Sequence, residues 1–201
     1  LIDSTDAILE SFHNSFDVHN FPHPDDKDIK NLIGYPLDVM YKELGVDESL
    51  AWAFVKTYKE YYQVVSTQKT YLLPKAKESV LLANDFAELG IVTTKTGIYS
   101  EVLMEHFDIM DYFKVLIGRE HVEHPKPHEE PILKALESFD VLNKEIWMIG
   151  DTKLDLISAK NAGVNSIGVL SGYDDEGTLK KYTEYIFTTA YEAIVFLRNK
   201  K

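Results

Sequence analysis

Apolar residues follow two different periods along the chain, and the change comes near residue 70. Before it, they recur every three or four positions, as in Ile8, Phe12 and Phe16, which predicts amphipathic helices with an aromatic-rich core. From Pro74 onward, short apolar runs alternate with helical stretches. That alternation predicts parallel strands joined by right-handed crossovers, so we expect a helical subdomain followed by a Rossmann-like, doubly wound α/β sheet.

The individual elements follow from these periods and from capping residues. In the first part we expect helices over residues 1–16, 25–34, 36–45 and 48–63, the last preceded by the cap Asp47, and no strand. In the second part we expect strands over residues 91–93, 115–117, 146–149, 166–170 and 185–187. The other helices are expected over residues 75–88, 99–107, 129–139, 154–162, 175–182 and 191–199.

The most informative loop follows the predicted strand at residues 146–149. Gly150 ends the apolar run, and Asp151 and Asp155 come next at the start of a helix. Both carboxylates are therefore expected at the carboxyl edge of the sheet, where open α/β sheets bind ligands. Two oxygen ligands one helical turn apart, without a third acid, suit Mg²⁺, which keeps several waters. The ordinary alternative is that Asp151 caps the helix and Asp155 lies in solvent.

Two further loops are expected at the same edge. Thr93 and Thr94 end one strand, where a hydroxyl and backbone N–H groups can hold a phosphate oxygen, although threonine is also common in strands and caps. Lys126 stands between two prolines that restrict its backbone, although a solvated surface lysine is the ordinary alternative. Hydroxyl, ammonium and paired carboxylates on successive strand ends resemble a phosphoryl-transfer site.

Composition limits the classes of function. The chain has 201 residues, 45% of them hydrophobic, enough for one well-buried domain or for one domain with a smaller insertion. A net charge of −12 argues against nucleic acid or an anionic membrane as a partner, and no apolar run is long enough to span a bilayer. The lack of cysteine excludes thiol catalysis and zinc–thiolate sites and fits a cytoplasmic location. A monomer and a homodimer both remain open.

Taken in order, these motifs resemble those of a known family. Thr93 after an apolar strand, Lys126 in HPKP, and GDTKLD running into DLISAKNAG resemble motifs two, three and four of the haloacid dehalogenase (HAD) superfamily. The branch that they resemble most is the phosphoglycolate phosphatase-like group. The resemblance implies three segments: a core start at residues 1–8, a cap at residues 9–72 and the α/β core at residues 73–201.

The resemblance implies a phosphatase that hydrolyses a small phosphorylated metabolite with Mg²⁺ through an aspartyl-phosphate intermediate. Thr93, Thr94 and Lys126 are implied to bind the phosphate, and Thr93 and Lys126 to be catalytic as well. Asp151 and Asp155 are implied to be metal residues, and Asp155 either binds through water or orients Lys126.

The helical part resembles the family's cap. IGYPL at residues 33–37 and YKEY at residues 58–61 resemble cap patterns, and Lys59 stands where arginine is usual. The residues implied to set specificity are Gly34, Tyr35, Leu37 and Lys59.

One part of the family pattern would precede Leu1. The family's nucleophile and general acid/base are the two aspartates of a DxDGT motif, and LIDS at residues 1–4 resembles the residues that follow it. We therefore expect the natural protein to extend ahead of Leu1 by a strand and this motif. A chain that truly started at Leu1 would be a non-catalytic binding domain. Smaller departures are Lys75, where glycine is common, and Glu129, where proline is common.

Phosphoglycolate is the first substrate that the resemblance implies, and pyrophosphate, nucleoside monophosphates and sugar phosphates are the alternatives. A mutase is disfavoured because Leu37 stands about where a cationic residue would be expected. A dehalogenase is disfavoured because Asp151, Asp155 and Lys126 together suit a metal and a phosphate.

Overall fold

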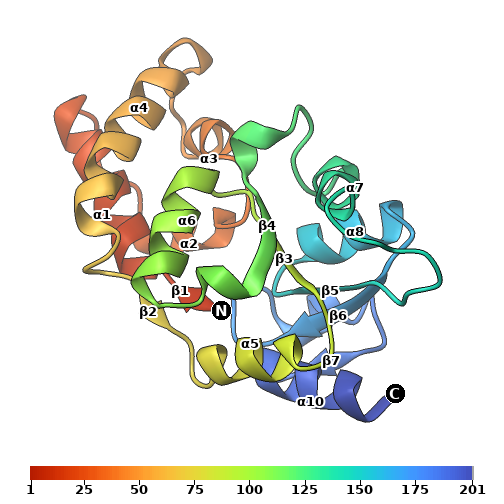
Figure 1. The fold of residues 1–201 in the computed structure, drawn as a ribbon. Coiled ribbons are helices and arrows are strands. Elements are labelled where there is room, and N and C mark those ends of the chain that lie inside the picture. Colours follow the sequence, from red (N-terminus) through yellow and green to blue (C-terminus); the bar gives the residue numbers. More distant parts are fainter. Residues whose placement is uncertain (201) are drawn as a thin grey trace. The chain divides into compact units, whose positions relative to one another are not determined.

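The computed structural model describes residues 1–200, which divide into two units (Figure 1). The helical unit is Ile2–Tyr71, and the α/β unit is Leu1 together with the residues from Leu72 onward. Residues 2–8, expected to start the α/β core, group with the helical unit instead. The reason is that the helix that starts at Thr5 packs along the last long helix of the same unit.

Four helices form the helical unit: α1 (Thr5–Val18), α2 (Asp26–Leu32), α3 (Leu37–Glu43) and α4 (Glu48–Val65). These correspond to the four predicted helices. The cap predicted at Asp47 is confirmed, because its carboxylate accepts the backbone N–H of Ser49 at 2.9 Å. Packing of α1 on α4 buries the apolar face of each helix, as the periodicity of these segments requires.

The core of the helical unit is aromatic. Phe54 on α4 is completely buried, and its ring lies 5.2 Å from the rings of both Phe16 and Phe21 and 5.3 Å from that of Tyr41. The ring of His19 stacks on that of Phe54, with centroids 4.2 Å apart. Phe54 is therefore the residue about which the helices of this unit pack.

The expectation of a helix from residue 1 and of no strand in this region is wrong. Ile2–Asp3 forms strand β1, which pairs with β2 (Tyr71–Leu72) where the chain passes between the units. The helix starts only at Thr5, because the Asp3 carboxylate accepts both the backbone N–H and the hydroxyl of Thr5, at 2.9 and 2.6 Å. A two-residue strand is too short to produce an alternating pattern in the sequence.

The α/β unit contains every strand that the sequence predicts, each within two residues of its expected start. They are β3 (Leu89–Val92), β4 (Phe113–Ile117), β5 (Trp147–Gly150), β6 (Asn165–Val169) and β7 (Ile186–Phe187). The helices are α5 (Ala76–Asn84), α6 (Gly97–His106), α7 (Glu130–Leu136), α8 (Lys153–Asn161), α9 (Glu176–Leu179) and α10 (Ala190–Lys200), with 3₁₀ turns at Met110–Tyr112 and Arg119–His121.

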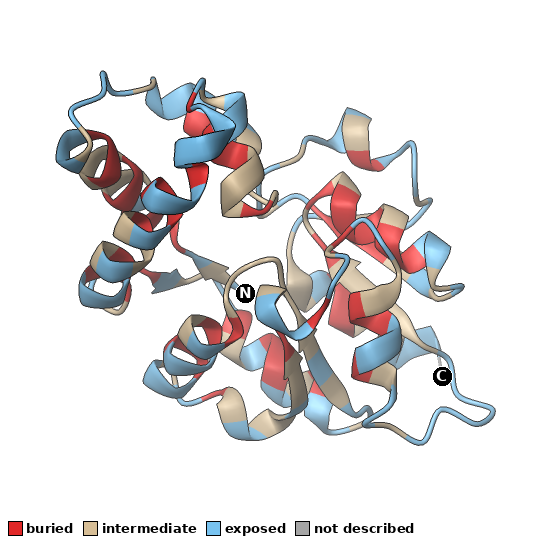
Figure 2. Cartoon of the chain, turned by 90° about the horizontal axis from the view of Figure 1, so that it is seen from above, coloured by how far each residue is buried: buried red, intermediate tan, exposed pale blue. Residues whose placement is uncertain are grey.

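The strands of the α/β unit pair in parallel, as predicted. β3 pairs with β4, and β5, β6 and β7 form a second sheet in that order. Ile167 and Val169 on β6 are buried together with Ala193 of α10. Figure 2 shows buried and exposed residues on opposite sides of the helices, which is the pattern of amphipathic helices that cover a core. None of the helices within residues 1–200 has the length and hydropathy needed to cross a membrane.

Replacing Phe54 by alanine should destabilise the protein strongly. The substitution leaves a cavity among four aromatic rings, and we expect the free energy of unfolding to fall by about 3–5 kcal/mol. Trp52 on the same helix is 65% exposed and provides the control, with an expected change of at most about 0.5 kcal/mol for Trp52→Ala. Denaturant unfolding followed by circular dichroism measures both, and equal losses would contradict the proposed role of Phe54.

Candidate functional site

The three predicted loops come close together at Lys126. This lysine lies in one loop, contacts Asp155 in a second, and contacts the end of the strand that precedes the third. The Lys126 ammonium donates hydrogen bonds to the carbonyl oxygen of Val92 at 3.1 Å and to Oδ1 of Asp155 at 2.5 Å. Val92 is the last residue of β3, so the next residue, Thr93, starts the loop beside this contact. The structure therefore brings together the loops of Thr93, Lys126 and Asp155, which lie far apart in the sequence.

Lys126 is not a solvated surface lysine. Its side chain is 9% exposed and that of its partner Asp155 is 6% exposed. Two charges withdrawn from water lose several kcal/mol of hydration each, and only their mutual attraction and further hydrogen bonds offset that loss. A buried ion pair of this kind at the carboxyl end of parallel strands is a feature typical of a functional site.

Asp155 is held on both of its oxygens. Oδ1 pairs with Lys126, and Oδ2 accepts the backbone N–H of Thr152 at 3.0 Å and its hydroxyl at 2.9 Å. Thr152 is thus the residue that caps α8, in a reciprocal arrangement with Asp155 at the third helical position. The alternative in which Asp151 caps the helix and Asp155 lies in solvent is wrong.

Asp151 lies one residue beyond β5 and points into the protein. Its Oδ2 accepts the backbone N–H of Tyr173 at 3.2 Å, and its carbonyl oxygen accepts the backbone N–H of Asp174 at 3.2 Å. Burial raises the pKa of the Asp151 carboxyl above its ordinary value, and the negative charge of Asp155 raises it further. A desolvated carboxylate beside a second acid is an arrangement that a bound cation would stabilise.

The loop at residues 170–175, which encloses Asp151, was not identified from the sequence. A Cβ atom at Gly172 would overlap the Asp151 carboxylate, so only glycine allows this approach of the backbone. Gly150 is required for the same reason, because a Cβ atom there would overlap the side chain of Asp155. Gly172 lies three residues after the end of β6, and a glycine so soon after a buried strand is the signal in the sequence that indicates this close approach.

Thr93 continues the hydrogen bonding of β3 and then turns. Its backbone N–H donates to the carbonyl oxygen of Ile117 at 2.9 Å, and its hydroxyl oxygen accepts the backbone N–H of Lys95 at 3.1 Å. Because the hydroxyl acts as acceptor in this bond, its own hydrogen remains for donation to a ligand. Thr94, the next residue of the same bend, is half-buried.

Comparison with known proteins supports what this geometry indicates. Residues 1–169 match the sequence profile described as "Haloacid dehalogenase-like hydrolase". The chain belongs to the haloacid dehalogenase-like hydrolase family. The family and the α/β fold class expected from the sequence are both confirmed.

Relatives and solved structures of this family cover almost the whole chain. "Probable phosphatase IndB" of Dickeya dadantii is 28% identical over 201 residues, which is 97% of this chain and 87% of that protein. "Phosphoglycolate phosphatase" of Photorhabdus laumondii is 25% identical over 186 residues, 87% of this chain and 77% of that protein. A crystal structure of a haloacid dehalogenase-like hydrolase from Bacteroides fragilis is 26% identical, with a TM-score of 0.90 over 96% of this chain and 94% of that one.

Glu130, which the sequence analysis did not single out, holds the loop that carries Lys126. Its carboxylate accepts the backbone N–H of Glu123 at 2.8 Å and that of His124 at 2.9 Å. It lies in the first turn of α7, six and seven residues from these donors. An acid in a first helical turn is common for other reasons, so the sequence alone gave no sign of this role.

The residues implied to set specificity all lie in the helical unit. Gly34, with a φ of 112°, and Tyr35 lie in the connection between α2 and α3, and Leu37 is the first residue of α3. Lys59 is half-buried on α4, whereas Lys56 on the same helix is exposed. Gly34, Tyr35 and Leu37 therefore lie together at the start of α3, and Lys59 lies on α4.

The pKa of Glu130 should prove to be unusually low. The backbone N–H groups of Glu123 and His124 lower it from 4.5 to about 2, because they bind the ionised carboxylate. Glu130 therefore stabilises the fold fully above pH 4.5, and that contribution is lost as the pH falls towards about 2. The carboxyl ¹³C resonance of Glu130, assigned with Glu130→Gln, should keep its ionised position down to about pH 4. A midpoint near 4.5 would contradict this assignment of the hydrogen bonds.

Proposed function

We propose that this protein is a Mg²⁺-dependent phosphatase that hydrolyses a small phosphomonoester through an aspartyl-phosphate intermediate. The observation that carries the proposal is the buried Lys126, which joins the end of β3 to Asp155 and lies in the loop beside Glu130. A fixed, desolvated ammonium beside a hydroxyl and a buried acid matches what phosphoryl transfer needs, because catalysis of that reaction is mainly positioning and charge stabilisation.

The acidic residues fit a hard divalent cation. Asp151 offers carboxylate oxygens in a desolvated position, which suits Mg²⁺ and not a soft metal. Asp155 already uses Oδ1 for Lys126 and Oδ2 for Thr152, so we assign it to orienting the lysine and to binding the metal at most through water. Bound Mg²⁺ would offset negative charge on the phosphoryl oxygens.

The chain's own groups would orient the phosphate. The Lys126 ammonium has three hydrogens, of which the contacts with Val92 and Asp155 use two, so the third can be donated to a phosphoryl oxygen. The Thr93 hydroxyl can donate a second hydrogen bond, and the backbone N–H of Thr94 a third. Each of these donors is strengthened where water is excluded.

The nucleophile and the general acid/base would come from two aspartates ahead of Leu1. The backbone nitrogen of Leu1 lies close to the carboxylates of both Asp151 and Asp155. A residue joined to Leu1 would enter the site at this point. One aspartate would form the bond to phosphorus while the bond to the leaving oxygen breaks, and the other would protonate that oxygen.

Phosphoglycolate is the substrate that we propose first, since a relative over 87% of this chain is named a phosphoglycolate phosphatase. Pyrophosphate, nucleoside monophosphates and sugar phosphates are the alternatives. Selection among them is assigned to Gly34, Tyr35, Leu37 and Lys59, on their resemblance to cap segments of the family. We also propose a cytoplasmic location, which the lack of cysteine fits.

Asp151→Asn should abolish Mg²⁺-dependent hydrolysis of p-nitrophenyl phosphate by the protein at its natural length. Loss of the metal ligand removes stabilisation of the transition-state charge, and we expect kcat to fall about a hundredfold or more. Asp111→Asn, at an exposed aspartate of the same unit, is the matched control and should retain the parent's rate. An Asp151→Asn protein as fast as the parent would refute the metal assignment. A parent that binds phosphate without turning over substrate would indicate a binding domain.

Lys59→Ala and Leu37→Ala should alter substrate preference more than general activity. We expect the ratio of kcat/KM for phosphoglycolate to that for p-nitrophenyl phosphate to change about tenfold, the effect of losing one good polar or apolar contact. Lys56→Ala is the control for Lys59→Ala. Lys56 is an exposed lysine of α4 that forms a surface ion pair with Glu60, so its loss should leave the ratio unchanged. Equal effects of Lys59→Ala on both substrates would argue against its role in specificity.

A further inference from the structure

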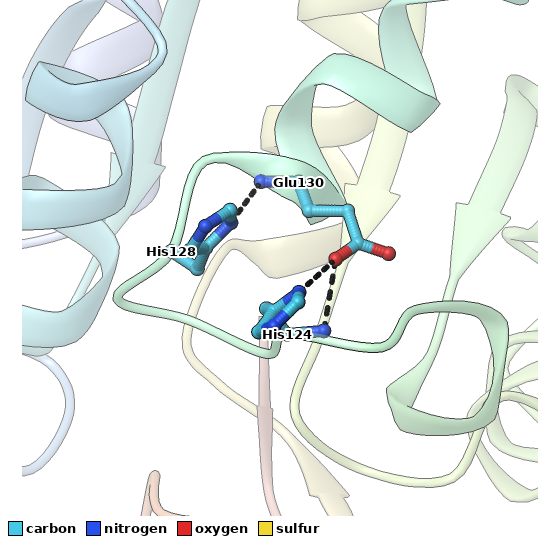
Figure 3. Close-up of side chains that lie close together, drawn as sticks. All are labelled: His124, His128 and Glu130. Atoms are coloured by element: carbon cyan, nitrogen blue, oxygen red, sulfur yellow. Dashed lines mark hydrogen bonds and ion pairs between the residues drawn. The ribbon is translucent and has the colours of Figure 1, made fainter.

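A second cluster of possible metal ligands lies on the outer side of the loop that carries Lys126. It consists of His124, His128 and Glu130, each of which offers one ligand atom, and these three atoms lie within 4.8 Å of one another (Figure 3). The two histidines are exposed and Glu130 is half-buried. None of the three takes part in the contacts of Lys126, Asp151 or Asp155 described above, so this cluster is separate from the proposed phosphatase site.

The side chains of the cluster already converge without a metal. Nδ1 of His124 lies 3.0 Å from Oε2 of Glu130, and Nδ1 of His128 lies 3.1 Å from the backbone nitrogen of Glu130. The two imidazole rings stack, with centroids 4.8 Å apart and planes inclined by 28°. Both rings therefore turn Nδ1 towards Glu130, as Figure 3 shows.

Small rotations of these side chains would complete a metal site. Donor atoms around a tetrahedral Zn²⁺ are separated by about 3.3 Å, as follows from bond lengths near 2.0–2.1 Å. The ligand atoms of His124 and Glu130, 3.0 Å apart, are already close to this separation, and the side chain of His128 is exposed. The cluster thus needs no change in the course of the backbone.

The chemistry of the donors selects the class of metal. Two imidazole nitrogens and one carboxylate oxygen suit Zn²⁺ and its transition-metal neighbours, whereas Mg²⁺ prefers oxygen ligands alone. We propose that His124, His128 and Glu130 bind one Zn²⁺-class cation, distinct from the cation assigned to Asp151. Water would complete the coordination at the exposed side.

The surroundings of the cluster favour a cation. Oε2 of Glu129 lies 3.7 Å from Nδ1 of His128, and the exposed Glu123 directly precedes His124 in the sequence. Lys134 lines the same pocket as His128 and Glu130, and its ammonium donates a hydrogen bond to the carbonyl oxygen of His121. The ammonium of Lys126, two residues from each histidine, is buried and paired with Asp155. Its positive charge is therefore largely compensated and opposes metal binding little.

Glu130 can bind a metal without releasing the loop. A carboxylate has about four lone-pair sites, and the backbone N–H groups of Glu123 and His124 occupy two of them. The ion would replace only the bond to the His124 ring and the bond between His128 and the backbone of Glu130. His124 and His128 stand two residues to either side of Lys126, so the bound ion would fix both ends of the loop that carries Lys126.

Titration of the full chain with Zn²⁺ by calorimetry tests this site. Mg²⁺ is kept in excess throughout to occupy the oxygen site. We expect one Zn²⁺ per chain and a loss of affinity of about tenfold or more in both His124→Ala and His128→Ala. His106→Ala is the matched control, because His106 is also exposed but lies at the end of α6 with its ring against Phe107. A parent that binds no Zn²⁺, or histidine variants that bind it like the parent, would refute the proposal.

Thermal unfolding distinguishes loss of the site from loss of the fold. Without Zn²⁺, His124→Ala and the less disruptive His128→Gln should melt as single folded species. Added Zn²⁺ should raise Tm of the parent and of His106→Ala but not of these two variants. Asp151→Asn should retain the Zn²⁺-dependent rise. If that rise disappeared in Asp151→Asn and persisted in His128→Gln, Zn²⁺ would bind at the oxygen site and the proposal would be wrong.

Discussion

The ion pair between Lys126 and Asp155 is the interaction on which the arrangement of the α/β unit's loops depends. It joins the loop after β4 to the start of α8, and the second hydrogen bond of Lys126 reaches the end of β3. Removing either partner would leave a buried charge without compensation, which costs about 3–5 kcal/mol in proteins. The ion pair therefore holds these loops together, and such a fixed arrangement of charges is the preorganisation that the proposed phosphoryl transfer needs.

Close approach of the backbone makes the buried charges possible. Gly150 lets the main chain pass against Asp155, and Gly172 lets the following loop close over Asp151. Thr152 then satisfies the remaining oxygen of Asp155 through its backbone and hydroxyl. Because both hydrogen bonds to Oδ2 of Asp155 come from its own helix start, the same contacts cap α8 and satisfy one oxygen of the buried acid.

The sequence predicted the strands, the parallel pairing and the three loops of the site, because each depends on a local pattern: an apolar run followed by a turn or a cap. It did not predict β1 and β2, which are too short to show a period and form by pairing across about seventy residues. It also missed Glu130 and the loop at Gly172. The role of Glu130 depends on the backbone N–H groups that its carboxylate accepts, and that of Gly172 on the carboxylate of Asp151 that packs against it. Both contacts form only when segments apart in the sequence come together.

The segment HPKPH shows how one short loop can carry two kinds of chemistry. Lys126 points inward, where burial and an acid on another helix fix its ammonium, whereas His124 and His128 remain exposed on the outer side. Glu130 holds the outer side through backbone bonds, and Val92 with Asp155 holds the inner side. Because each side has its own partners, a cation bound by the two imidazoles would stiffen the loop without competing for the lysine.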